Sequence, residues 1–316
     1  MNKHKKLWWL LLPPCLIMFT LLWRSTENNQ QNRIQKIGML QLVEHEALDA
    51  ARNGFIEGLK EFGFTGKINY KNAGDDLSTC ALIANQFVSE NCDLILAIAT
   101  PAAQSVAGVT SEIPILATPI TNHESAGLVK SNEYPQTNVT GTSDLPPIAK
   151  QIGLIKTLKP EAQNVGILFS LKETNSRYQA DIAIKEAEKI GLKSQVFTFS
   201  QVAEIQQVVE SMCTKVDATY TPTDNMVASN MELISKTAME YGIPVICSDV
   251  NLISKGAVGT FGVDYFELGK LTAKQAMKIL KNDAIPQNMP IECIENAQIR
   301  LNNEIIKKLN LREIEP

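Results

Sequence analysis

Several short polar segments carry side chains that could bind a charged small molecule. Asp144, Asp224 and Asp249 lie in or beside predicted turns, and their carboxylates suit an ammonium group. The segment 100–103 (TPAA) begins a predicted helix, whose hydroxyl group, backbone N–H groups and positive dipole end suit a carboxylate. Together these segments predict a site for a zwitterion such as an amino acid. Ordinary helix capping is the competing explanation, because Ser, Thr, Asp and Asn are common at helix starts.

Motifs for catalysis are missing from the sequence. It contains no GxSxG, no Gly-rich loop ending in a Walker lysine, no HExxH and no GxGxxG after the first predicted strand. Glu44 beside His45 could form an acid–base couple, but neighbours on one loop are more often ligand contacts or surface residues. We therefore expect neither an enzyme nor a bound cofactor.

Metal binding and a disulfide framework are equally unsupported. After residue 24 the sequence has two histidines, His45 and His123, and five scattered cysteines without a CxxC pair. We expect these cysteines to be small packed side chains, and the sequence leaves open whether any of them form a disulfide. The cysteines are Cys80, Cys92, Cys213, Cys247 and Cys293.

The chain repeats itself after about 130 residues. Four segments recur in the same order at nearly the same spacing, which predicts two copies of one α/β unit. KIGML at 36–40 recurs as NVGIL at 164–168, DLILAIATP at 93–101 as DATYTP at 217–222, IPILAT at 113–118 as IPVICS at 243–248, and SAGLV at 125–129 as SKGAV at 254–258.

Each copy is predicted to alternate buried strands with amphipathic helices. This pattern indicates two doubly wound lobes with parallel sheets, covered by helices on both faces. Ligands bind such sheets beyond the carboxyl ends of the strands, where the polar turns above would meet. The expected strands are 37–43, 67–70, 93–98, 165–169, 194–199 and 218–220, and the expected helices are 47–62, 77–89, 177–190 and 202–213.

Length, composition and charge set further bounds. The 316 residues are long enough for two cores, and with 44% hydrophobic residues the chain is not a disordered protein. Its net charge is −4, although the first 24 residues hold four of the 30 Lys and Arg residues and no acid. The remainder is therefore acidic, which argues against a nucleic-acid partner.

The N-terminal segment predicts export from the cytoplasm. Lysines within residues 1–6 precede an uncharged, mostly apolar run at 7–23, as in a secretory signal. No small-x-small cleavage site follows, so residues 1–24 are a signal sequence or, by preference, a retained membrane anchor. Residues 25–33 are polar and predict a flexible linker. Localisation is then periplasmic or at the extracytoplasmic face of the membrane.

Six stretches of the sequence resemble a known family, the ABC-importer substrate-binding proteins with the type I periplasmic-binding fold, specifically the tryptophan/tyrosine group. The similarity extends from about residue 34 to 311. The stretches are IGMLQLVEHEALDAARNGFIEGLKEFG at 37–63, DLILAIATPAAQ at 93–104, GLVK at 127–130 with NVTGTSD at 138–144, YTPTDNMVAS at 220–229, IPVICSD at 243–249 and GTFGVDYFELG at 259–269.

The resemblance implies a two-lobe clamp that closes on an amino acid and presents it to an ABC permease in the membrane. It assigns residues 34–141 plus 250–280 to lobe 1 and 142–249 plus 281–316 to lobe 2, joined by a hinge, in a protein expected to be a monomer. The implied ligand-binding residues are Glu44, His45, Thr100, Ala102, Ala103, Thr118, Asp144, Thr223, Asp224, Asn225, Asp249, Asp264 and Tyr265.

Other functions stay open at this point. An anchored module could sense the ligand without transporting it. A sugar or another small polar metabolite could replace the amino acid, although all three tryptophans lie within residues 1–24 and cannot stack on a sugar in the body. An aromatic amino acid is the favoured ligand.

Overall fold

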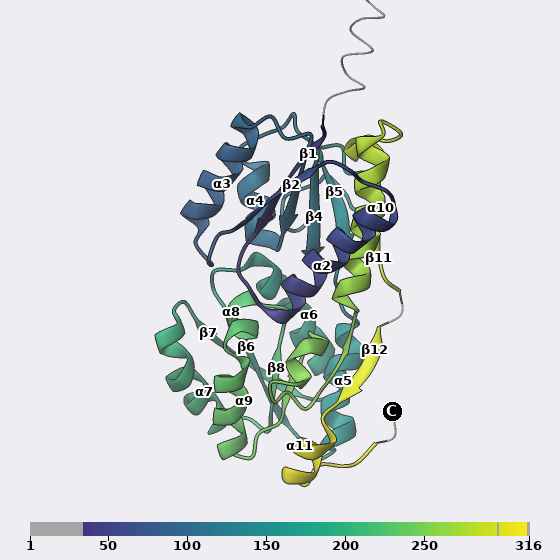
Figure 1. The fold of residues 1–316 in the computed structure, drawn as a ribbon. Helices are drawn as coiled ribbons and strands as arrows, with labels where there is room; N and C mark the ends of the chain where they lie inside the picture. The colour runs from purple at the N-terminus through teal and green to yellow at the C-terminus, as the bar shows by residue number, and fades with distance from the viewer. Residues whose placement is uncertain (1–33, 296, 315–316) are drawn as a thin grey trace, which may run out of the picture.

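The computed structural model describes residues 34–295 and 297–314, which form two α/β lobes stacked one above the other (Figure 1). The expected anchor at 1–24 and linker at 25–33 lie outside these residues. Within the described part of the chain, no helix combines the length and apolarity that crossing a membrane requires.

The first lobe is built on a six-stranded sheet with the strand order β11-β5-β4-β3-β1-β2, in which every pair is parallel. Continuous apolar runs form the inner strands because helices cover both faces of the sheet. The elements are β1 Lys36–Gln41, α2 Glu46–Glu61, β2 Lys67–Asn72, α3 Leu77–Ser89, β3 Leu94–Ile98, α4 Thr100–Ala107, β4 Ile115–Ile120 and β5 Val139–Ser143, with α10 Tyr265–Leu280, η3 Pro286–Asn288 and β11 Glu292–Cys293 added from late in the chain.

The second lobe repeats this plan with the order β12-β10-β9-β8-β6-β7. Its edge strand β12 is antiparallel to β10, which departs from the expected all-parallel sheet. The elements are α5 Ile148–Leu158, β6 Asn164–Ser170, α6 Thr174–Lys189, β7 Lys193–Phe199, η1 Val202–Glu204, α7 Ile205–Cys213, β8 Ala218–Thr221, α8 Asn225–Ser229, α9 Met231–Glu240, β9 Val245–Cys247, η2 Val250–Ile253, β10 Gly259–Gly262, β12 Gln298–Leu301 and α11 Asn303–Lys308.

The internal repeat and the two-lobe α/β fold are therefore confirmed. Matching strands occupy matching places in the two sheets, and β1 and β6 have a glycine at the equivalent position. A Cβ atom on Gly38 of β1 would lie 2.6 Å from the Phe87 ring, and one on Gly166 of β6 would lie 2.7 Å from Met212 Sδ. In both lobes the glycine lets a helix pack directly on the sheet.

Separate cores stabilise the two lobes. One cluster fills lobe 1 and includes residues of α10, and two clusters lie in lobe 2. Cys80, Cys92, Cys213 and Cys247 are free, buried thiols, as expected for small packed side chains, whereas the free thiol of Cys293 is exposed.

The chain passes between the lobes three times, and this corrects the expected lobe boundaries. The crossings follow β5, β10 and β11. Strand β10 belongs to the second sheet, so residues 250–262 lie in lobe 2 and not in lobe 1. Strand β11 pairs with β5, so residues 281–293 lie in lobe 1 and not in lobe 2. The expected boundaries came from the resemblance, whereas the repeat already places 254–258 in the second copy. Strands β11 and β12 come after the repeated segments, so the repeat does not assign them to a lobe.

Helix α10 is held in lobe 1 by very close packing against α2 (Figure 1). A Cβ atom on Gly54 of α2 would lie 1.9 Å from the Phe266 carbonyl oxygen, and one on Gly269 of α10 would lie 2.0 Å from the Ala51 carbonyl oxygen. Glycines at these contacts let the two helix backbones approach each other directly. The N-terminal end of α10 is thereby fixed beside the cleft.

Candidate functional site

A pocket lies between the lobes, at the carboxyl ends of both sheets. Its volume is about 420 Å³, counting the space at its mouth. This is the place that the topology of doubly wound sheets predicts for a ligand. The lining residues are His45, Ala47, Leu48, Ala99, Thr100, Pro119, Thr121, Asp144, Asn175, Pro222, Thr223, Asp224, Asn225, Ala228, Asp249, Leu252 and Tyr265.

Two buried acids lie at the hinge end of this pocket. Asp144 is in the first crossing, and its Oδ2 accepts a 3.1 Å hydrogen bond from the Tyr265 hydroxyl, whereas its buried Oδ1 has no hydrogen-bond partner. Asp249 follows β9, and its Oδ1 accepts from the backbone N–H of Asn251. Burial raises the pKa of each acid to about 6, and the proximity of the two charges adds to the rise for Asp249.

Helix α4 points its N-terminal end at the same pocket. Ala99, at its N-cap, has φ of +86°, a strained conformation for a residue with a Cβ atom. This turn places Thr100, which is 3% exposed, at the pocket wall. The first amides of a helix have no partners within the helix and carry partial positive charge. The wall therefore suits an anionic group.

A polar network forms the lobe 2 wall around the buried carboxylate of Glu173. Glu173 Oε1 accepts from the backbone N–H of Asn225 at 2.8 Å, and Oε2 accepts from Asn225 Nδ2 at 2.6 Å and Asn175 Nδ2 at 3.2 Å. Burial, and then the charge of nearby Asp224, raise the pKa of Glu173 well above its usual value. The network fixes the two asparagines at the pocket.

Asp224 is occupied as a helix cap. Its Oδ1 accepts from the backbone N–H of Val227 and its Oδ2 from that of Ser170. Both oxygens are thus used inside lobe 2. For this residue the capping explanation accounts for the carboxylate, whereas Asp144 Oδ1 has no hydrogen-bond partner.

Hydrogen bonds cross from one lobe to the other around the pocket. His45 Nε2 lies 3.0 Å from Asn225 Oδ1, and Gln179 Nε2 donates to Thr121 Oγ1 at 2.8 Å. Since Asn225 Nδ2 donates to Glu173, its oxygen faces His45, and His45 Nε2 must be the donor. Longer contacts join Gln104 to Thr174 and Asn122 to Tyr178. The lobes are closed on each other.

Eight of the thirteen residues expected at the ligand line the pocket: His45, Thr100, Asp144, Thr223, Asp224, Asn225, Asp249 and Tyr265. The structure places the other five outside its lining. Ala102 and Ala103 pack into the lobe 1 core, and Thr118 shares a buried 2.7 Å hydrogen bond with Thr142. Asp264 is exposed and caps α10.

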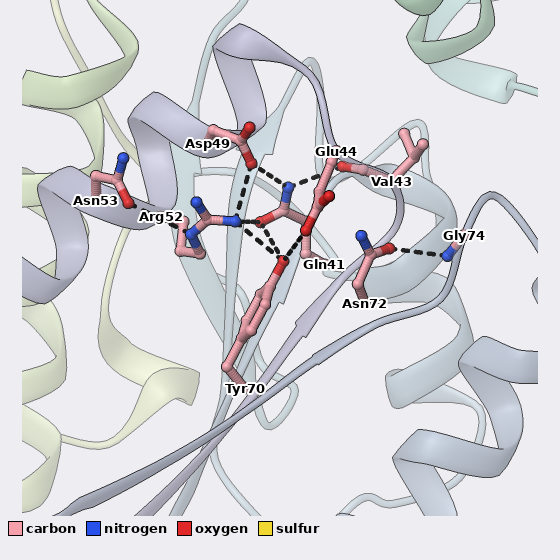
Figure 2. A network of polar contacts seen from close by, with 9 residues as sticks. All are labelled: Gln41, Val43, Glu44, Asp49, Arg52, Asn53, Tyr70, Asn72 and Gly74. Carbon is pink, nitrogen blue, oxygen red and sulfur yellow. Dashed lines mark hydrogen bonds and ion pairs between the residues drawn. The ribbon is translucent and has the colours of Figure 1, made fainter.

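Glu44 is the fifth residue outside the lining, and it lies at the exposed end of a half-buried polar network on lobe 1. Figure 2 shows its carboxylate beside the Tyr70 hydroxyl, which also meets Arg52 at 3.0 Å. Arg52 binds Asp49 and Gln41, and Gln41 donates to the Val43 carbonyl oxygen. The network holds the 42–45 loop on the side away from the cleft. His45, which follows Glu44, lines the cleft.

Asn175 and Ala99 line the pocket but are not among the thirteen residues expected at the ligand, although the turn 173–175 was expected at the cleft. Asn175 lies within a polar turn after β6, and its buried, unpartnered Oδ1 is a property of the packed network alone. Nothing in the sequence marks Ala99, because alanine rarely has positive φ. The apolar lining, such as Leu48 and Leu252, comes from helix starts whose orientation depends on the packing of the lobes.

The fold and the cleft define a two-lobed solute-binding protein, in which a small molecule is enclosed between domains that move about a hinge. The chain belongs to the ABC transporter substrate binding protein family, whose model matches residues 36–315. It is thus a transporter component that binds a small molecule outside the cytoplasm, and the family is one of binding proteins and not of enzymes.

Several relatives are similar over nearly the whole chain. The tyrosine-binding protein of Clostridioides difficile strain R20291 is 37% identical over 295 residues, covering 92% of this chain and 84% of the relative. A Streptococcus pneumoniae ABC domain solved with L-Trp is 34% identical with a TM-score of 0.86, covering 89% of this chain and 96% of that chain.

A second pair of structures bears on the conformation. A ligand-free, open substrate-binding protein from Clostridium difficile is 40% identical, covering 89% of this chain and 96% of that chain, yet its TM-score is only 0.70. The L-Trp complex is less similar in sequence but more similar in shape. The lower TM-score against the open structure agrees with the closed lobe arrangement that the hydrogen bonds across the cleft indicate.

Proposed function

We propose that the protein captures an amino acid, an aromatic one by preference, in the cleft between its lobes. The observation that carries this proposal is the buried, unpartnered Oδ1 of Asp144, which lies with Asp249 at one end of a pocket whose wall includes the N-terminus of α4. Acids at one position and helix amides at another match the ammonium and carboxylate groups of a zwitterion. The L-Trp complex and the tyrosine-binding relative support this class of ligand.

The apolar lining favours an amino acid over a sugar. Leu48, Pro119, Pro222 and Leu252 line the pocket, and Tyr265 is the single aromatic among its described lining residues. The Tyr265 hydroxyl is bound to Asp144, which leaves one ring at the hinge and no pair of rings to sandwich a sugar. The aliphatic part of the lining suits the side chain of a hydrophobic amino acid.

We further propose how the protein is placed and used. Residues 7–23 hold it at the extracytoplasmic face of the membrane, and the closed lobes of a monomer are presented to an ABC permease. The basis is the lysine-flanked apolar run and the family membership. If the protein instead senses the ligand without transporting it, removing the permease should abolish ligand uptake but leave the cellular response to the ligand intact.

Isothermal titration calorimetry of residues 25–316 with the twenty amino acids tests the ligand class. We expect L-tyrosine, L-tryptophan or both to bind, and Asp144→Ala and Asp249→Ala to weaken that binding by about tenfold or more, the value of one charge-assisted hydrogen bond. Circular dichroism would check that both variants fold. Unchanged affinity in both variants would contradict the ammonium assignment.

A further inference from the structure

Asn175 lines the pocket, and hydrogen bonds fix the orientation of its side-chain amide. Its side-chain Nδ2 donates to the Thr223 carbonyl oxygen at 2.9 Å and to Glu173 Oε2 at 3.2 Å, so the amide cannot be flipped without losing both bonds. Its Oδ1 is buried and has no hydrogen-bond partner. The residue as a whole is 6% exposed. A buried acceptor of this kind is costly unless a ligand satisfies it.

Glu173 holds this orientation and distinguishes Asn175 from its neighbour. The same carboxylate also binds Asn225 Nδ2, but the Asn225 oxygen is already used by His45 on the other lobe. Of these two asparagines, Asn175 alone has its acceptor left for a ligand. Asn225 is therefore a natural control for the effects of disturbing the Glu173 network.

The strand order locates Asn175 away from the head-group acids. Asp249 follows β9 and Asn175 follows β6, and β8 lies between these two strands in the sheet. Strands are ~4.8 Å apart, so the two positions are separated by roughly 10 Å along the sheet edge. That distance is of the order of the length of an aromatic amino acid, from its α-ammonium group to the far side of its ring.

We propose that Asn175 Oδ1 accepts a hydrogen bond from a donor on the distal part of an aromatic ligand side chain, a phenolic hydroxyl or an indole N–H. Glu173 is the positioning residue that keeps the acceptor turned toward the ligand. This inference rests on the proposed function, because it requires the amino-acid head group to bind at Asp144 and Asp249. In this proposal one side chain, Asn175, selects ligands that have a hydrogen-bond donor on the aromatic ring.

The physical reason for selectivity is the unpaired acceptor. A ligand that lacks the donor would leave Asn175 Oδ1 buried without a partner, and such sites reject the lacking analogue strongly. We therefore expect the protein to bind L-tyrosine at least about tenfold more tightly than L-phenylalanine, or L-tryptophan more tightly than 3-benzothienyl-L-alanine, in which sulfur replaces the indole N–H.

Calorimetric titration of these two ligand pairs tests the proposal. In Asn175→Leu the preference for the donor-bearing member should fall to less than about threefold, mainly because its binding weakens. Asn175→Ser, which shortens the side chain, should do the same if the leucine variant does not fold. Glu173→Gln should reduce the same preference by loosening the amide, which a purely structural role would not do.

The control variant is Asn225→Leu, which breaks the contact with His45 and should weaken both members of each pair equally. A wild-type protein that prefers neither donor-bearing ligand, or an Asn175→Leu protein that keeps the wild-type preference, would overturn the inference. If the wild-type protein binds none of the four ligands, the aromatic-ligand part of the proposed function fails, and that result differs clearly from binding without preference.

Discussion

At the scale of single residues, the cleft contains buried acids that are unfavourable for the fold. Asp144 is buried with one oxygen unpaired, and its pKa is raised to about 6 by loss of solvation. A folded protein with a raised carboxyl pKa binds more protons than the unfolded chain between pH ~4 and 6. Its free energy of unfolding therefore falls as the pH rises through this window.

Asp144→Asn should stabilise the ligand-free protein at pH 8, because the buried charge is removed. The shift from 3.8 to about 6 sets an upper limit of about 3 kcal/mol on the gain. Urea unfolding at pH 4 and pH 8 would measure it, with a much smaller difference expected at pH 4. The exposed Asp283→Asn is a control that should change little. Destabilisation at pH 8 would contradict the prediction.

The same acids predict pH-dependent affinity. An ammonium group requires charged Asp144 and Asp249, whose pKa values of about 6 mean that both gain protons below that pH. Amino-acid affinity should be constant between pH 7 and 8 and fall below pH 6, by up to about tenfold per pH unit for each acid. Burial raises the pKa of Tyr265 and lowers that of His45, so both stay neutral near pH 7. Titrations from pH 4.5 to 8 would show whether the fall is present.

At the scale of elements, the contact between α2 and α10 fixes one end of the cleft. Gly54 and Gly269 allow the backbones to touch, and the small cluster of Ala47, Ala51, Val263 and Tyr265 joins α2 to the second crossing. A shift of α10 would therefore move Tyr265 and, through its hydroxyl, Asp144. Helix packing in lobe 1 and ligand geometry at the hinge are coupled.

Gly54→Ala should destabilise the protein by about 1–3 kcal/mol, because the new methyl group would collide with the Phe266 carbonyl oxygen. Gly153→Ala is the matched control. Gly153 lies in α5, where an added methyl group would have nothing within 4 Å, so alanine there should stabilise by about 0.5–1 kcal/mol through helix propensity. Urea unfolding of both variants would reveal opposite signs; equal effects would count against the close packing.

At the scale of the whole molecule, the lobes form a clamp whose closure depends on few direct contacts. The bonds from His45 to Asn225 and from Gln179 to Thr121 connect elements that are otherwise in separate lobes. A ligand shifts such an equilibrium by binding the closed state more tightly than the open one. Saturating ligand at ~100 times its dissociation constant would also stabilise the fold by ~2.7 kcal/mol.

His45→Ala should shift the ligand-free protein toward the open state and raise its dissociation constant for an amino acid by roughly threefold to tenfold, as expected for one hydrogen bond of about 1 kcal/mol. Small-angle X-ray scattering should show a larger radius of gyration without ligand, and the wild-type value when ligand is saturating. Identical scattering curves for the wild-type and variant proteins, both without ligand, would mean that this contact does not control closure.

The repeat in the sequence was enough to predict two similar α/β lobes and a polar cleft at the carboxyl ends of their strands. Strand and helix periodicity is local, and parallel sheets of this kind have their loops in known places. Only the tertiary structure showed that β11 pairs in lobe 1, that Asp224 is a helix cap, and that Asp144 and Asn175 each have a buried oxygen without a hydrogen-bond partner. Whether a polar atom is paired depends on neighbours that are distant in sequence, and no local pattern records them.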